Sequence, residues 1–267
     1  MNKLRLAVIV VFAVVAVVFL TARVTALFHK TSTPVITADP ELEISVRQDM
    51  EEQLLRGVTA YDKKDGDLSD RVMIADISDL IGDQTVKVTY IVFNSDKQMT
   101  SFERTVRLTD YTPPRFRLVK PLTFDSKAKA TIADRLFADD VIDGDLSSSI
   151  RVSVGSETAT EIPMTVEVTN SIGDTVSLDL TITIQAADSG RPIITLTDYI
   201  VYLPIGSVFD AAAYLKTITV GSASASVASV DLLSEPDTAV PGAYPVTYSY
   251  TAASGKTGTA TLIVVVE

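Results

Sequence analysis

The chain has 267 residues and contains no cysteine, no tryptophan and a single histidine. Without cysteine it can form neither a disulfide nor a thiol nucleophile, so its domains must be stable through packing alone. The lone histidine, His29, lies beside an N-terminal apolar run, so neither a Ser-His-Asp triad nor a histidine-ligated metal site can form farther along the chain. We therefore expect a protein that is not an enzyme. Exported proteins without cysteine are common in Gram-positive-type bacteria, which suggests a bacterial surface protein.

No acidic residue precedes Asp39, and an unbroken apolar run covers residues 6–20. Lys3 and Arg5 stand before this run and Arg23 follows it. Basic residues ahead of an apolar segment keep the N-terminus in the cytoplasm and direct the rest of the chain across the membrane. Residues 1–30 are thus predicted to be a membrane anchor or a cleaved signal segment.

We favour the anchor, because the sequence has no C-terminal hydrophobic tail that could hold the protein at the membrane instead. The expected location is the cell membrane, with a single pass through a transmembrane helix and extracytoplasmic C-terminal modules. The alternative is a secreted protein. The predicted partners are the membrane, through the N-terminal helix, and other envelope proteins or cell-wall components.

Beyond residue 30 the chain is strongly acidic. Four of the 23 basic residues and none of the 34 acidic residues lie in the first 30 positions. The rest of the chain therefore has 19 basic and 34 acidic residues, a formal charge of −15. Phosphate binding relies on clustered lysine and arginine, so we expect no nucleic-acid partner. The charge suits a well-solvated surface, or cation binding.

A five-residue identity marks an internal repeat, because Asp-Gly-Asp-Leu-Ser occurs at 65–69 and again at 143–147. Segments 86–92, 164–169 and 244–250 alternate apolar and polar residues and are rich in valine, threonine and tyrosine. This pattern predicts strands with one face in a core. Each segment precedes a polar turn and another strand, so a hairpin closes each module.

Proline-containing segments at 109–114 and 187–192 separate the modules. We predict immunoglobulin-like domains at 31–112, 113–190 and 191–267, the third one divergent. Roughly 75–80 residues suffice for about seven short strands in a two-sheet sandwich. Residues 50–55 and 211–215 could each form a helical turn, but no extended helical periodicity follows the N-terminal segment. The expected fold class is all-β, with tandem immunoglobulin-like β-sandwiches after an N-terminal transmembrane helix.

The segment 57–69, Gly-Val-Thr-Ala-Tyr-Asp-Lys-Lys-Asp-Gly-Asp-Leu-Ser, resembles the signature of bacterial immunoglobulin-like domains of the pesticidal-crystal-protein type. These domains occur in tandem on Gram-positive surface proteins. Segment 88–92 resembles the penultimate strand of that family. The second module keeps the Asp-Gly-Asp motif but changes the residues that lead into it, and the third resembles the family only from 241 to 248. The resemblance implies a non-catalytic extracellular module and no particular ligand.

Two clusters of aspartate accompany the repeated motif: Asp62, Asp65 and Asp67 in the first copy, and Asp140, Asp143 and Asp145 in the second. Three carboxylates around a glycine can converge on Ca²⁺, although the spacing is not that of an EF-hand. The interpretation that we favour is a turn, in which Gly66 and Gly144 adopt positive φ and the carboxylates cap backbone N–H groups. Paired carboxylates could also serve a glycosidase, but repetition is expected of structure rather than of one active site. No cofactor is expected, with calcium left open.

Glycan sites commonly use aromatic platforms, and in the absence of tryptophan five tyrosines could supply one: Tyr61, Tyr111, Tyr199, Tyr202 and Tyr214. Tyrosines within predicted strands, such as Tyr90 and Tyr248, are expected in the core. The Ser/Ala-rich stretch 221–229 is read as a loop, or as a weak edge strand that could accept a partner strand. The predicted function is a cell-surface stalk or protein-interaction scaffold, and the alternative is a calcium- or carbohydrate-binding adhesion protein.

Overall fold

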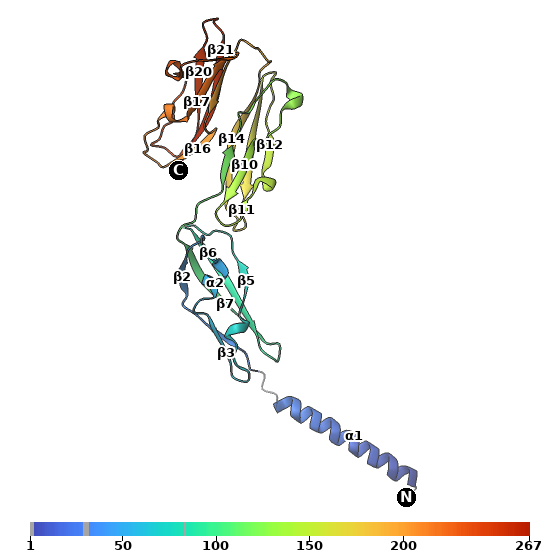
Figure 1. Cartoon of the computed structure of the whole chain (residues 1–267). Helices are drawn as coiled ribbons and strands as arrows, with labels where there is room; N and C mark the ends of the chain where they lie inside the picture. The colour runs from blue at the N-terminus through green and yellow to red at the C-terminus, as the bar shows by residue number, and fades with distance from the viewer. Residues whose placement is uncertain (1–2, 29–31, 83) are drawn as a thin grey trace. The chain divides into compact units, whose positions relative to one another are not determined.

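The computed structural model describes residues 3–28, 32–82 and 84–267 (Figure 1). The chain divides into two compact units. Unit 1 holds the residues up to 44 together with 48–108, and unit 2 holds 45–47 together with 109–267. Apart from one N-terminal helix and a few short helical turns, both units are built from β-strands. The prediction of an all-β fold is therefore confirmed.

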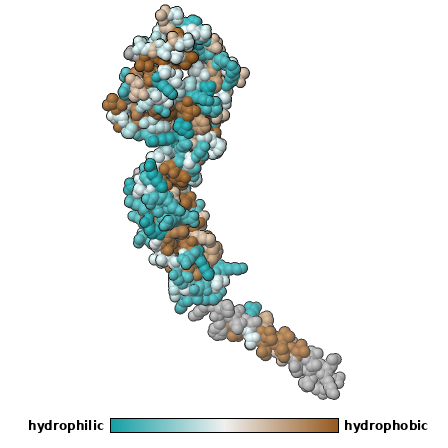
Figure 2. All heavy atoms as spheres, in the orientation of Figure 1, coloured by the Kyte–Doolittle hydropathy of each residue, from teal (hydrophilic) through white to brown (hydrophobic). Residues whose placement is uncertain are grey.

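The N-terminal segment forms helix α1 (Lys3–Phe28), and apolar side chains such as Phe12 and Leu20 lie exposed on it. Figure 2 shows hydrophobic residues in brown on this helix, while hydrophilic residues cover much of the visible face of unit 1. Among the residues that the structure describes, no helix is both long enough and apolar enough to cross a membrane. The predicted transmembrane helix is therefore not found.

Unit 1 contains seven strands in two sheets, one with the order β1-β3-β4 and one with the order β2-β7-β6-β5. We call this set of seven strands module 1. Its strands are β1 (Val35–Thr37), β2 (Glu41–Ile44), β3 (Thr59–Asp62), β4 (Gly66–Asp67), β5 (Met73–Ile77), β6 (Thr85–Phe93) and β7 (Met99–Leu108).

Unit 2 contains the same arrangement twice. In module 2 the sheets have the orders β11-β10-β8 and β12-β13-β14-β9. The strands of module 2 are β8 (Arg115–Leu118), β9 (Thr123–Phe124), β10 (Leu136–Asp140), β11 (Gly144–Asp145), β12 (Arg151–Val154), β13 (Glu161–Thr169) and β14 (Thr175–Ile184).

Module 3 repeats the arrangement with the orders β15-β17-β18 and β16-β21-β20-β19. Its strands are β15 (Pro192–Leu196), β16 (Ile200–Leu203), β17 (Leu215–Val220), β18 (Ala223–Ser224), β19 (Asp231–Leu232), β20 (Gly242–Thr251) and β21 (Thr257–Val266). The Ser/Ala-rich stretch 221–229 contains the short strand β18 and a 3₁₀ turn at Val227–Ser229, so it is neither wholly a loop nor an extended strand. Module 3 lacks the Asp-Gly-Asp motif, yet its topology is that of the other two.

One parallel pairing recurs in every module. Strand β2 pairs with β7, β9 with β14, and β16 with β21, each in parallel, whereas the other strand pairs are antiparallel. The last two strands of each module form the predicted hairpin, and their turns begin after Phe93, Thr169 and Thr251. Helical turns lie between the second and third strands of each module: helix α2 (Met50–Leu55) and 3₁₀ turns at Lys127–Lys129 and Ala211–Tyr214. The two turns predicted at 50–55 and 211–215 are thereby confirmed.

Alternate residues of the long strands face the cores, as the sequence pattern predicts. In β6 the buried side chains are Val86, Val88, Tyr90 and Val92. The hydroxyl of Tyr90 donates to the carbonyl of Leu54 in α2, at 2.7 Å, so that the buried polar group is satisfied. In module 3, Tyr248 donates in the same way to the carbonyl of Ala211, at 2.9 Å.

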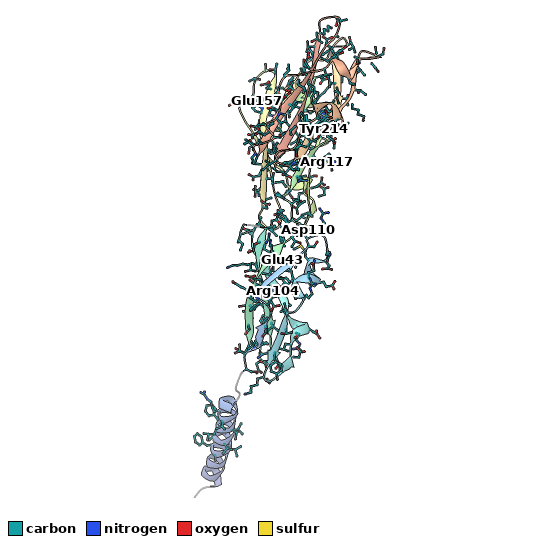
Figure 3. All side chains as sticks on the ribbon, turned by 90° about the vertical axis from the view of Figure 1, so that its left-hand side faces the viewer. Glu43, Arg104, Asp110, Arg117, Glu157 and Tyr214 are labelled. Atoms are coloured by element: carbon teal, nitrogen blue, oxygen red, sulfur yellow. The ribbon has the colours of Figure 1, made fainter. Side chains whose placement is uncertain are left out.

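Module 1 also buries a cation. The side chain of Arg104, on β7, is buried, and its Nη1 donates to the carbonyl of Arg56 at 3.2 Å (Figure 3). In unit 2 the buried residues of modules 2 and 3 form one hydrophobic cluster that runs from Phe116 to Val266. Both units are therefore held by apolar packing, in keeping with a chain that has no cysteine.

Candidate functional site

The first aspartate cluster lies where β3 turns into β4. Asp62 ends β3 and pairs with Gly66, the first residue of β4. Gly66 has φ +79°, a left-handed conformation that glycine adopts without steric cost. The positive φ predicted for this glycine is confirmed, and the same holds for Gly144, which has φ +73°.

Asp62 is fully buried and accepts hydrogen bonds from both sides. Its Oδ1 accepts from the backbone N–H groups of Lys64, at 2.8 Å, and Asp65, at 3.0 Å. The hydroxyl of Ser32 donates to the same oxygen at 2.8 Å, and Nδ2 of Asn94 donates to Oδ2 at 3.2 Å. This carboxylate thus ties together three segments that are distant in the sequence.

The other two carboxylates of the cluster face separate groups. Asp65 accepts from the backbone N–H and the hydroxyl of Ser95, at 2.5 and 2.7 Å. Asp67 accepts from the backbone N–H and the hydroxyl of Ser69, at 2.9 and 2.6 Å. The carboxylates are therefore directed at three different sets of donors.

These donors favour the ionised carboxylates. Burial alone would raise the pKa of Asp62, but the hydrogen bonds from Ser32, Asp65, Asn94 and Lys64 outweigh it and lower the pKa to about 2. The backbone and side chain of Ser95 lower the pKa of Asp65 in the same way. The side chain and backbone N–H of Ser69 lower the pKa of Asp67. All three carboxylates are therefore stabilised in their charged form.

Module 2 contains a near copy of this network. Asp140 is buried, and its Oδ1 accepts from the backbone N–H groups of Ile142, at 2.8 Å, and Asp143, at 2.9 Å. Its Oδ2 accepts from Nδ2 of Asn170 at 3.1 Å. The remaining two members of the cluster repeat their roles, with Asp143 accepting from the N–H of Ser171 at 2.6 Å and Asp145 from the N–H of Ser147 at 2.9 Å. The hydroxyl and N–H of Ser147 lower the pKa of Asp145.

Two asparagines that were not among the predicted site residues complete these networks. Asn94 and Asn170 each begin the turn of the final hairpin, and each also accepts a backbone hydrogen bond within its own turn, at 2.8 and 2.9 Å. They link the aspartate turn to the hairpin turn at one end of each module. The signal was present in the sequence, because Asn-Ser recurs at 94–95 and 170–171 with nearly the spacing of the Asp-Gly-Asp motif.

The network also holds the segment that enters each module. In module 1 the carbonyl of Ser32 accepts from Nδ2 of Asn94 at 2.6 Å. In module 2 Tyr111 takes this place, donating to Asp174 at 2.5 Å and accepting from Asn170 at 2.9 Å. Burial, together with the adjacent Asp174 carboxylate, raises the pKa of Tyr111 well above its usual value. Tyr111 is therefore a buried structural residue.

Module 3 replaces the polar network by apolar side chains. Val220 ends β17 where Asp62 ends β3, and Ala252 stands at the start of the hairpin turn where Asn94 stands in module 1. Ala252 is buried and Val220 is half-buried. The aspartate and the asparagine are thus lost together, as expected of groups that satisfy one another.

The geometry of the clusters is that of the turn that we favoured. Six carboxylates accept from nearby N–H and hydroxyl groups, and no group of three or more His, Cys, Asp or Glu residues in the described part of the chain is arranged to hold a metal ion. Calcium binding therefore stays a prediction. His29, the single histidine of the sequence, lies outside the described residues.

The five tyrosines considered for a glycan platform differ in exposure. Tyr111 and Tyr199 are each 4% exposed, whereas Tyr61 is 62% exposed. Tyr202 is half-buried, and its hydroxyl accepts from the N–H of Phe116 at 2.7 Å. Tyr214 is half-buried and stacks on Phe209 with the ring centroids 5.8 Å apart. Of these five, Tyr61 alone presents a mainly exposed ring.

No protein-family model matches the chain, and no curated protein matches it. Among solved structures, it is similar to the CBM51-2 and INT domains of Clostridium perfringens ZmpB in complex with GlcNAc, with 17% identity and a TM-score of 0.25 over 51% of this chain and 29% of the other. The structure of the M60 catalytic domain with the CBM51-1 and CBM51-2 domains of the same protein gives 14% identity and a TM-score of 0.25. This match covers 88% of this chain and 31% of the other.

A protocadherin gammaB7 EC3-6 cis-dimer structure gives 7% identity and a TM-score of 0.20 over 88% of this chain and 74% of the other. The chain spans about 30% of the two Clostridium perfringens chains that it matches. At these identities and scores, the matches assign the chain to no family.

Proposed function

We propose that this chain is a non-catalytic extracytoplasmic protein whose tandem immunoglobulin-like modules serve as an envelope stalk or protein-interaction scaffold. The observation that supports this proposal most directly is the threefold repetition of one seven-strand arrangement. A repeated unit suits a spacer, which needs length and a stable shape. A single reacting centre does not require repetition.

The aspartate networks support the same proposal. Their carboxylates are occupied with backbone and side-chain donors that hold the end of a module together. The residues with the most distinctive chemistry in this chain thus act within the fold. We propose that modules 1 and 2 are variants of the bacterial immunoglobulin-like type that segment 57–69 resembles, with module 3 a divergent copy.

The proposed location rests on the sequence of the first 30 residues. Basic residues followed by an apolar run direct the remainder of the chain out of the cytoplasm. In intact cells, added protease should degrade the part beyond residue 32, while a cytoplasmic control protein survives. Complete protection in intact cells, with degradation after lysis, would overturn the proposed location.

Mass spectrometry of the mature protein then separates the two forms of export. A peptide that begins at Met1, recovered from the membrane fraction, indicates an anchor. An N-terminus between residues 21 and 30, recovered from the medium, indicates a cleaved signal segment. The scaffold proposal holds with either form.

Calcium and glycan binding are the outcomes that would replace the scaffold by an adhesion module. Because the carboxylates already accept from protein donors, calcium should leave the melting temperature of the full chain unchanged. A rise of several degrees that disappears in Asp65→Ala/Asp67→Ala would show a calcium site. Likewise, binding to a glycan array that is lost in Tyr61→Ala but kept in Tyr214→Ala would show a sugar site.

A further inference from the structure

Three strands occupy the same edge in the three modules, and they differ in how well that edge is protected. Strand β5 carries a register irregularity between Ile74 and Asp76, and β19 is only two residues long. Bulges and short lengths are common means of preventing an edge from pairing with another chain. Strand β12 (Arg151–Val154) has neither, because it is regular over four residues and contains no proline.

The β12 edge also exposes side chains that point toward the core. Val152 and Val154 lie opposite Val166 and Met164 of β13, which are buried, so all four share the inner face of the sheet. Yet Val152 is 44% exposed and Val154 is 57% exposed. The three-stranded sheet of module 2 therefore leaves this edge of the core uncovered.

An apolar groove of about 360 Å³ opens beside these valines. Its floor and walls include Ala130, Ile132, Ile162, Met164 and Ile182. At its rim, Lys127 and Glu157 form an ion pair at 2.8 Å. Glu157 is labelled in Figure 3, at the outer left-hand edge of unit 2 in that view. The groove is thus apolar inside, and its charged rim is already neutralised.

The direction of the backbone groups of β12 follows from one hydrogen bond. The N–H of Gly155 donates to the carbonyl of Pro163 at 2.8 Å, which places Gly155 in a hydrogen-bonded position of the ladder. In an antiparallel pair such positions alternate along the strand. Arg151 and Ser153 therefore direct their backbone groups toward β13, whereas Val152 and Val154 direct theirs away from it.

We propose that β12 pairs in antiparallel fashion with β12 of a second copy of this chain, around a twofold axis at Ser153. The sequence Val152-Ser153-Val154 reads the same in both directions, which is the self-complementarity that a twofold interface requires. In this register Val152 of each copy lies opposite Val154 of the other. The outward N–H and C=O groups of both valines are then paired, and the four valines cover the two grooves.

The charges of the edge permit this pairing. Arg151 has a side chain that is 81% exposed, and in this register it lies opposite the uncharged Gly155 of the second copy. The two Arg151 side chains thus avoid each other across the axis. At longer range the copies repel, because the chain carries a formal charge of −11. Association should therefore strengthen as salt is raised to screen that repulsion.

A single introduced cysteine tests the register, since the chain has none of its own. Ser153 would face its copy at a non-hydrogen-bonded position, where Cα atoms lie about 4.5 Å apart, a separation that a disulfide can bridge. Under mild oxidation the full-length Ser153→Cys variant should form a covalent dimer. The matched control is Ser177→Cys, at an exposed position of the inner strand β14 of the same sheet, which should form at least tenfold less dimer.

A second substitution separates edge pairing from chance collision. Val154→Pro removes an outward N–H without breaking a bond to β13, so module 2 should keep its melting temperature within a few degrees. Combined with Ser153→Cys, it should lower the dimer yield at least tenfold. Equal yields from the two cysteine variants, or a yield that Val154→Pro leaves unchanged, would overturn the proposal. A cross-link from Ser153→Cys to a different envelope protein instead of a second copy would overturn it too.

Discussion

Asp62 illustrates how a β-sandwich keeps a buried carboxylate ionised. The side chain has no contact with solvent, yet two backbone N–H groups, one hydroxyl and one side-chain amide donate to it. An ionised carboxylate that accepts several hydrogen bonds is favoured over the neutral acid, which explains the lowered pKa. The same residue therefore contributes a charge without being available for chemistry.

The first prediction concerns Asp62→Asn. The pKa of Asp62 lies at about 2 in the folded chain, below the usual 3.8. Its ionised form therefore stabilises the fold at pH values above 3.8, and this stabilisation is lost as the pH falls from 3.8 toward 2. At pH 6 the variant should melt several degrees below the natural chain, because an amide NH₂ would face N–H donors. The difference should shrink steadily between pH 4 and pH 2, as measured by thermal unfolding.

Asp70→Asn provides the control, since Asp70 is exposed on the 3₁₀ turn that follows β4. It should leave the melting temperature of unit 1 unchanged at every pH. If the melting temperature of Asp62→Asn stayed below that of the natural chain by the same amount down to pH 2, the effect could not be assigned to the ionised carboxylate.

At the scale of elements, the tight turn between β3 and β4 depends on glycine for its backbone and on aspartate for its hydrogen bonds. Gly66 and Gly144 both have positive φ, and a Cβ built on either would meet no atom within 4 Å. The requirement for glycine is therefore conformational and does not arise from crowding. The corresponding turn of module 3 is one residue shorter, because Val220 pairs with Ala223, and it too contains a glycine with positive φ, Gly221 at +61°.

The second prediction follows from this backbone. Gly66→Ala and Gly144→Ala should each destabilise their unit by about 1–2 kcal/mol, the cost of a left-handed conformation for a residue with a Cβ. Gly242→Ala is the matched control, since this strand residue has an ordinary φ and its nearest neighbouring atom would lie at 3.4 Å. Chemical denaturation measures all three. Equal losses for the three variants would show that the turns do not need glycine.

For the whole molecule, the division of the chain is into two compact units, while the strand topology repeats three times. The two descriptions differ because the buried residues of modules 2 and 3 form one hydrophobic cluster. The predicted domain boundaries at 112 and 190 fall between the three repeats of the strand topology. That each repeat is a separate domain stays a prediction. The predicted transmembrane helix is the part of the expected architecture that was not found.

The third prediction is that the chain unfolds in two thermal transitions. Asp62→Asn should lower only the transition of unit 1, and Gly144→Ala only that of unit 2, because compact units with separate cores unfold independently. Differential scanning calorimetry of both variants checks this. Three transitions, or a shift of both by one substitution, would contradict it.

The sequence alone determined the strands, their hairpins and the repeat, because these depend on neighbours a few residues apart. The alternation of Val86, Val88, Tyr90 and Val92 was sufficient to predict the buried face of β6. Only the tertiary structure decided which groups meet the aspartates, since Ser32 and Asn94 lie 30 and 32 residues from Asp62. Nor could the sequence show that Val152 and Val154 stay exposed on an inner face. Exposure depends on how far the opposite sheet extends, and that is set by the packing of whole elements.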